Sequence, residues 1–142
     1  MLFAKDITKS WLKTEEFERK QKRASGILRR LERTYPLAKI ALRYSGPMQL
    51  LAAVILSAQA TDKKVNEVTA RLFKRYKTVN DFAEADPKKF TEEIRQTGFY
   101  RQKALSIITS ARIIRDKFGG ALPRTMDEML LLRGVTRKTA NV

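Results

Sequence analysis

A short apolar stretch constrains the fold of this chain more than any other feature. It runs from Met48 to Leu56 and includes the residues Leu-Leu-Ala-Ala-Val-Ile-Leu at positions 50–56. Pro47 precedes it, and proline is well tolerated at the first position of a helix. A helix that is apolar on all sides must be buried on all sides. The stretch therefore predicts the central helix of a bundle, with other helices packed around it.

The remaining segments supply the other helices. Residues 13–34 are amphipathic with helical spacing, and strand-like alternation is absent throughout the chain. Helix starts are predicted at Thr61-Asp62 and Asp86-Pro87, and the residues from Thr125 to Glu128 match a capping box. Glycine stops are predicted at Gly98 and at Gly119-Gly120, on either side of a long helix. We expect an all-α protein with about seven helices.

The charge balance points to a polyanionic partner. Lys and Arg number 30 against 15 Asp and Glu, which gives +15 at pH 7. Such an excess favours nucleic acid or an anionic membrane, with a merely soluble basic protein as the alternative. No signal peptide is visible, and the apolar run at 50–56 is far too short to span a bilayer. We therefore expect a cytoplasmic, nucleoid-associated protein with no membrane partner.

The absence of certain residue types narrows the chemistry. The chain has no cysteine and no histidine. This excludes a thiol nucleophile, a Ser-His pair and a cysteine-ligated zinc or iron–sulfur site from these residues. We expect no metal site and no cofactor in this chain.

The residues from Leu132 to Val142 predict a helical hairpin that binds a phosphate backbone. Gly134 can adopt positive φ and allows close approach of a ligand. Unpaired N–H groups at the start of the following helix suit a phosphate, and no base need be read. The candidate DNA-binding residues here are Arg133, Gly134, Val135, Thr136 and Arg137. The alternative is an ordinary helix–turn–helix corner with exposed cations.

Lys138 is the candidate catalytic residue. It lies in the first turn of the predicted helix beside Arg137. An uncharged lysine amine can attack a sugar C1′ and form a Schiff base. The alternative is a solvated surface charge, and only the hairpin context favours the catalytic role.

Two further residues are candidates for contact with DNA. Gln59 follows the central helix among small residues, and its amide could replace hydrogen bonds lost by an extruded base. It could instead bond to nearby backbone. Phe99 lies on a tight turn between Gly98 and Tyr100. It could be a wedge between base pairs, or a hydrophobic contact that seals the helix corner.

Three segments together resemble the endonuclease III family: Leu56–Asp62, Thr97–Ala104 and Leu132–Val142. The resemblance implies a helix-hairpin-helix glycosylase fold with a six-helix barrel domain. It also implies base excision repair, with removal of oxidised pyrimidines from duplex DNA and cleavage at abasic sites by β-elimination. By resemblance, Lys138 is the Schiff-base nucleophile, Gln59 fills the gap left by the flipped base, and Phe99 is the wedge.

The hairpin departs from the family pattern at two positions. Arg133 stands where the family usually has proline, and Thr136 stands at its second glycine. If that position needs positive φ, threonine costs about 1–2 kcal/mol. Thr136 could instead cap the following helix through its hydroxyl.

The resemblance also suggests that residues 1–142 form the amino-terminal portion of such an enzyme. The family's catalytic aspartate and its four cluster cysteines lie beyond the segment that matches Val142. We expect an N-terminal extension at 1–23, a glycosylase-like domain at 24–142, and a monomer. We also expect at most feeble Schiff-base trapping, with no release of a lesion base. The alternative is a non-catalytic module that binds DNA backbone.

Overall fold

The computed structural model of the chain describes residues 16–142. The chain divides into two compact units, Met1–Lys39 and Ile40–Val142. The first residues of the predicted 13–34 helix and most of the predicted 1–23 extension lie outside the described residues. Between residues 16 and 142 there are helices, turns and no strand, so the all-α prediction is confirmed.

The first unit contributes one described helix, α2 (Phe17–Thr34). It is amphipathic, as its spacing predicts, but it has no buried residue. The apolar side chains of Ile27, Leu28 and Leu31 are exposed. Neither α2 nor any other described helix is long and apolar enough to cross a membrane.

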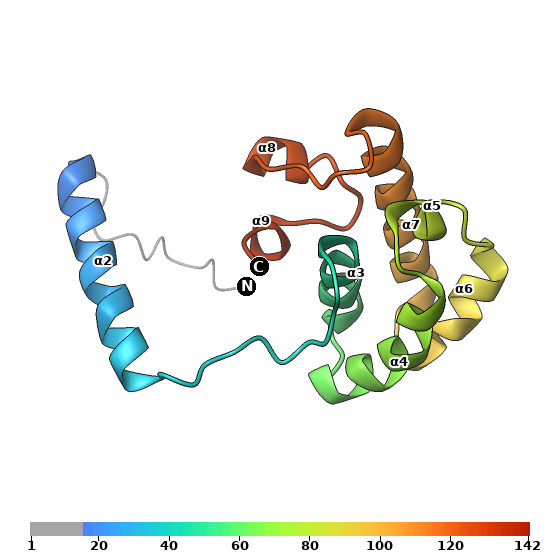
Figure 1. Cartoon of the computed structure of the whole chain (residues 1–142), viewed down its shortest axis with the longest axis horizontal. Coiled ribbons are helices and arrows are strands. Elements are labelled where there is room, and N and C mark those ends of the chain that lie inside the picture. Colours follow the sequence, from blue (N-terminus) through green and yellow to red (C-terminus); the bar gives the residue numbers. More distant parts are fainter. Residues whose placement is uncertain (1–15) are drawn as a thin grey trace, which may run out of the picture. The chain divides into compact units, whose positions relative to one another are not determined.

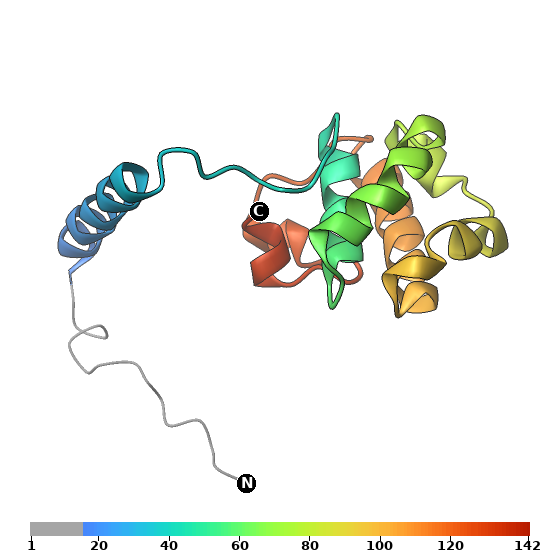
Figure 2. The same ribbon diagram turned by 90° about the horizontal axis from the view of Figure 1, so that it is seen from below.

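The second unit is a helical bundle. Its elements are α3 (Pro47–Ser57), α4 (Asp62–Arg75), α5 (Val79–Ala83), α6 (Pro87–Glu93), the 3₁₀ helix η1 (Arg95–Thr97), α7 (Tyr100–Lys117), α8 (Met126–Met129) and α9 (Arg137–Ala140). Helix α3 contacts α4, α7 and α9, and α7 also contacts α5 and α6 (Figures 1 and 2).

The central position of α3 follows from its sequence. Its buried residues are Met48, Gln49, Leu51, Ala52, Ala53, Ile55 and Leu56. Leu50 and Val54 are only half-buried, so one stripe of α3 is less covered than its sequence predicts. That stripe lines a pocket beside α8 and α9, together with Met126 and Met129.

Gln49 is the one polar residue that α3 buries. Its amide nitrogen donates to the Tyr76 carbonyl oxygen at 3.0 Å, and its amide oxygen accepts from the Ser45 N–H at 2.9 Å. A buried polar group costs little free energy when both its donors and its acceptor are satisfied. Gln49 therefore fixes the start of α3 against the end of α4.

The predicted helix ends are largely confirmed. The Thr61 hydroxyl accepts from the Lys64 N–H, and the Asp86 carboxylate accepts from the Lys89 N–H at 2.7 Å. Thr125 and Glu128 form the predicted capping box at α8. Gly98 and Gly120 both have positive φ, at 68° and 83°.

Helix α5 was not predicted, because five residues are too few to show a period. Thr78 and Asp81 form a reciprocal capping box around it. Phe82 of α5 is fully buried, with its ring 5.4 Å from that of Tyr76. The Thr-x-x-Asp spacing was the signal that could have identified this helix.

The first prediction concerns Asp81. Its carboxylate accepts from the N–H groups of Thr78 and Lys77, each at 2.8 Å, and these hydrogen bonds hold its pKa below the ordinary value. The stability this adds is present above the ordinary carboxyl pKa, about 3.9, and is lost as pH falls through the lowered value. We expect Asp81→Ala to lower the free energy of unfolding by about 1 kcal/mol at pH 7.

Denaturant titrations of both proteins between pH 7 and pH 2 measure this effect. The difference between wild type and Asp81→Ala should shrink as the wild-type carboxyl is protonated. Asp127→Ala, at an exposed position of α8, is the control and should show little change at any pH. A pH-independent loss for Asp81→Ala would contradict the assigned role.

Candidate nucleic-acid interface

The predicted hairpin lies between α8 and α9. Leu132 and Val135 are buried, and the Val135 N–H donates to the Leu132 carbonyl oxygen at 3.3 Å. Arg133, Gly134, Thr136 and Arg137 are exposed. The side chain of Val135 therefore anchors the hairpin in the core, and the exposed face consists of its neighbours.

Helix α7 fixes the position of the hairpin. The Ser110 hydroxyl donates to the Arg133 carbonyl oxygen at 2.9 Å. Gly134 has φ 76°, and a Cβ atom added to it would lie 2.8 Å from Ser106 Oγ. Glycine is thus required at residue 134 by both its backbone angle and its close approach to α7.

Thr136 is a helix cap. Its φ is −107°, and its hydroxyl accepts from the Thr139 N–H at 3.4 Å. The possibility of a strained threonine at this position was wrong, because the backbone there is extended. Thr136 begins α9 and so determines where Lys138 lies.

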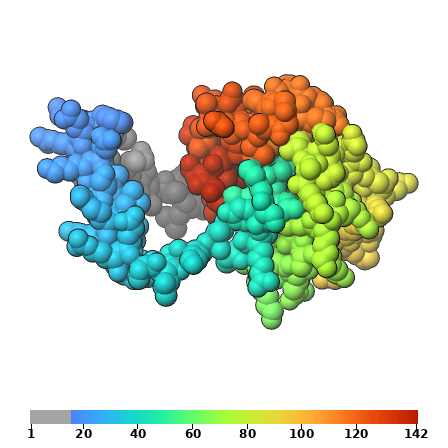
Figure 3. Space-filling model, viewed as in Figure 1, coloured from blue at the N-terminus to red at the C-terminus, as the bar shows by residue number. Residues whose placement is uncertain are grey.

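Lys138 is the second residue of α9 and is exposed. It lines a pocket of about 460 Å³ between the hairpin and the end of α3. Gln59, Gly134 and Thr136 line the same pocket. The space-filling view shows the C-terminal segment packed against the segment that contains α3 (Figure 3). Residues that are about eighty positions apart in sequence are therefore brought together around one cavity.

Asp62 is a pocket residue that was not among the predicted site residues. It is the first residue of α4 and lines the cavity with Gln59 and Lys138. The sequence predicts Asp62 only as a possible helix cap. Its closeness in sequence to Gln59 was the signal that could have identified it.

Gln59 and Phe99 share an unusual backbone conformation. Among residues 16–142 they are the non-glycine residues with positive φ, at 54° and 47°. Such angles cost about 1 kcal/mol or more for an L-residue and concentrate at functional sites. The Gln59 side chain is exposed and makes no hydrogen bond with the described residues. Phe99 is 68% exposed, so it does not seal the helix corner.

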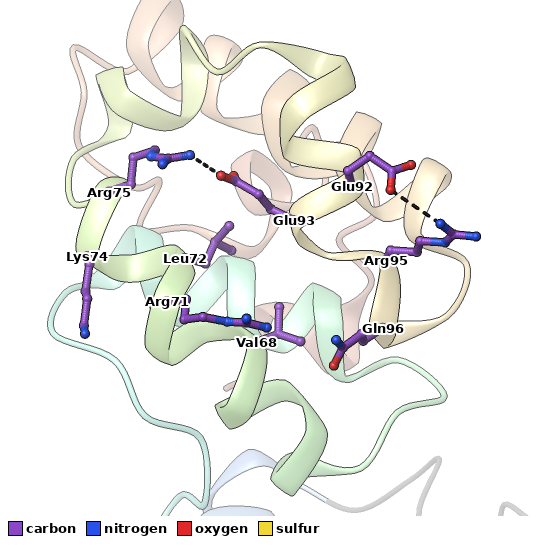
Figure 4. Close-up of a pocket in the computed structure, with 9 residues that line it drawn as sticks. All are labelled: Val68, Arg71, Leu72, Lys74, Arg75, Glu92, Glu93, Arg95 and Gln96. Atoms are coloured by element: carbon purple, nitrogen blue, oxygen red, sulfur yellow. Dashed lines mark hydrogen bonds and ion pairs between the residues drawn. The ribbon is translucent and has the colours of Figure 1, made fainter.

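A second, larger pocket lies away from these residues. It has a volume of about 750 Å³ and is lined by α4, α6 and η1 (Figure 4). Its walls carry the Arg75–Glu93 and Arg95–Glu92 ion pairs. None of the residues predicted to bind DNA lines it.

The sequence of the second unit matches that of a known family. Residues 52–141 match the model of the HhH-GPD superfamily base excision DNA repair proteins. The chain belongs to this superfamily. Endonuclease III of Synechocystis sp. is 49% identical over 123 residues, which cover 87% of this chain and 56% of the relative. Endonuclease III of Bacillus subtilis is 43% identical over 108 residues, which cover 76% and 49%.

Solved structures agree with this family assignment. A non-covalent endonuclease III–DNA complex matches with a TM-score of 0.75 and 40% identity, covering 85% of this chain and 56% of that one. A thermostable thymine-DNA glycosylase matches with a TM-score of 0.72 and 21% identity, a likeness of fold alone. The chain spans about half the length of these relatives. The helix-hairpin-helix glycosylase fold predicted from the sequence is confirmed.

The second prediction tests how the hairpin is anchored. We expect Gly134→Ala to lower the free energy of unfolding by more than Gly120→Ala does. Both changes place alanine at positive φ, at a cost of about 1–2 kcal/mol. Only Gly134→Ala also meets a neighbouring side chain, that of Ser106, which adds about 1–3 kcal/mol.

Denaturant unfolding of the two variants measures the difference. In a background that carries Ser106→Gly, Gly134→Ala should lower the free energy of unfolding by less than it does in the wild type, because the clash with Ser106 is absent. Equal losses for Gly134→Ala and Gly120→Ala would show that α7 does not constrain the hairpin.

Proposed function

We propose that this chain binds duplex DNA at a damaged pyrimidine or an abasic site, as a monomer, and reacts with the sugar through Lys138. The observation that carries the proposal is the pocket lined by both Lys138 and Gln59. The exposed hairpin cations Arg133 and Arg137 supply charge beside it, within a chain of net charge +15. A chromosomal substrate would place this activity in the cytoplasm, with the nucleoid.

We assign each residue a role from its place in the structure. The hairpin contacts backbone phosphates, which orients the duplex without reading its sequence. Gln59 and Phe99 enter the base stack from their two turns and hold one nucleotide outside it. The extruded sugar then enters the pocket, where the Lys138 amine reaches its C1′ atom.

The proposed reaction at an abasic site has two steps. The uncharged Lys138 amine adds to the C1′ aldehyde, and water leaves as the protonated Schiff base forms. A base then takes a C2′ proton, the C3′–O bond breaks, and the strand on the 3′ side leaves with a 5′-terminal phosphate.

Acid–base assistance to these steps has one candidate among the residues that line the pocket, Asp62. A carboxylate near C1′ can stabilise developing positive charge or accept a proton. The chain contains no cysteine, so these residues do not fit an iron–sulfur cluster. No step of the proposed reaction involves one.

The third prediction tests the nucleophile with a pre-formed abasic site, which requires no base release. Incubation with abasic duplex DNA and borohydride should give a covalent protein–DNA complex, visible on a denaturing gel. Lys138→Ala should remove this complex, because the amine that forms the Schiff base is absent.

Arg137→Ala is the matched control. It removes the same charge from the neighbouring exposed position, so it should weaken binding while trapping continues at saturating DNA. Trapping that survives Lys138→Ala would remove Lys138 from the mechanism. DNA binding without any trapping by the wild-type chain would favour a non-catalytic backbone-binding module.

A further inference from the structure

A buried lysine on α7 lies apart from the candidate nucleophile. Lys103 is 5% exposed, among the apolar residues of the core. Its ammonium donates to the Leu56 carbonyl oxygen at 2.8 Å and to the Thr97 carbonyl oxygen at 2.7 Å. Burial lowers the pKa of Lys103, because the charged form loses its hydration. A charge in such a place requires strong partners, and here they are two backbone carbonyls.

Both carbonyls lie at helix ends. Leu56 is in the last turn of α3, and Thr97 is the last residue of η1. Carbonyls at such positions lack a helical partner. The Ala60 N–H, which would bond to Leu56 in a continued helix, instead donates to the Ser57 carbonyl at 3.1 Å. Lys103 thus satisfies the ends of two separate helices with one side chain.

These helix ends lead directly into the two strained turns. Gln59 lies three residues after Leu56, and Phe99 lies two residues after Thr97. The Lys103 N–H also donates to the Phe99 carbonyl oxygen at 3.1 Å. One residue therefore bonds through its side chain to the backbone just before each turn, and it bonds to Phe99 itself through its own backbone N–H.

The positive φ values of Gln59 and Phe99 must be held by their surroundings. Among residues 16–142 the Gln59 side chain has no hydrogen-bond partner that could do so, and Phe99 is largely exposed. The Lys103 hydrogen bonds tie the backbone before each of these turns to α7. An apolar side chain of similar size would fill the space but leave both carbonyls unsatisfied.

We propose that Lys103 is a positioning residue that holds the Gln59 and Phe99 turns at the separation needed for both side chains to enter the stack at one nucleotide. The inference rests on the proposed function, since it assigns Lys103 a role in recognising a disrupted nucleotide. Lys103 does not touch the sugar or the reacting atoms.

The test compares affinities for two duplexes of the same sequence, one intact and one with a tetrahydrofuran abasic analogue. Lys103→Met in the full chain should reduce the preference for the analogue about tenfold or more, because charge-assisted hydrogen bonds to both turns are lost. Affinity for the intact duplex should change little, since the hairpin that contacts phosphates is unaltered.

Two comparisons separate positioning from general stability. Ile114→Ala removes a fully buried side chain from the same helix and should lower the melting temperature while the preference for the analogue is kept. The double variant Lys103→Met, Gln59→Ala should show a smaller fold-loss of preference for the analogue than the product of the two single-variant fold-losses. The reason is that both changes act through the Gln59 turn.

The outcomes distinguish this inference from the proposed function. If the wild-type chain does not prefer the analogue, the proposed function fails and this inference fails with it. If wild type prefers the analogue and Lys103→Met keeps that preference, the role of Lys103 alone is overturned. Should Lys103→Met fail to fold, Lys103→Gln replaces it. Its side chain is one atom shorter, so reduced preference is expected, and wild-type preference would overturn the proposal.

Discussion

Burial of α3 is the constraint on which the rest of the second unit depends. Its residues are apolar around almost the whole helix, so water must be excluded from nearly every side. Helices α4, α7 and α9 contact it, and Gln49 ties its start to the end of α4. The end of α3 therefore lies at a fixed place in the bundle, and the Gln59 turn begins there. If a side chain on a turn is to contact DNA in one orientation, the turn must be attached to a rigid scaffold.

Helix α7 positions both the two turns and the hairpin. Its first half holds the two turns through Lys103, and its middle receives the hairpin through Ser106 and Ser110. The hairpin proposed to bind phosphates and the residues proposed to enter the base stack are thus both positioned by one helix. We infer that a change in α7 would alter the spacing between backbone contact and nucleotide extrusion. In the proposed function, this spacing decides whether an extruded sugar reaches Lys138.

Much of this architecture could be predicted from the sequence, for local reasons. Capping residues such as Thr61 and Asp86 act within one turn, and the apolar character of α3 shows in its own residues. The superfamily also follows from the motifs around Gln59, Phe99 and Lys138. The roles of these residues remain predictions.

What could not be predicted depends on contacts between distant segments. Lys103 stands in the polar stretch Tyr-Arg-Gln-Lys, which gives no sign that its side chain enters the core. The presence of Asp62 in the pocket and the burial of Val135 likewise depend on how α4 and the hairpin meet α3. The exposure of Phe99 depends on the turn that carries it, since the same ring could have covered the corner.

The central claim is that the pocket beside Gln59 delivers a sugar C1′ to Lys138. Mass spectrometry of the borohydride-trapped complex, after digestion of both protein and DNA, tests it most directly because it identifies the modified residue. The account predicts a deoxyribose remnant on the peptide that contains Lys138. A remnant on the amino terminus or on any other lysine would contradict it.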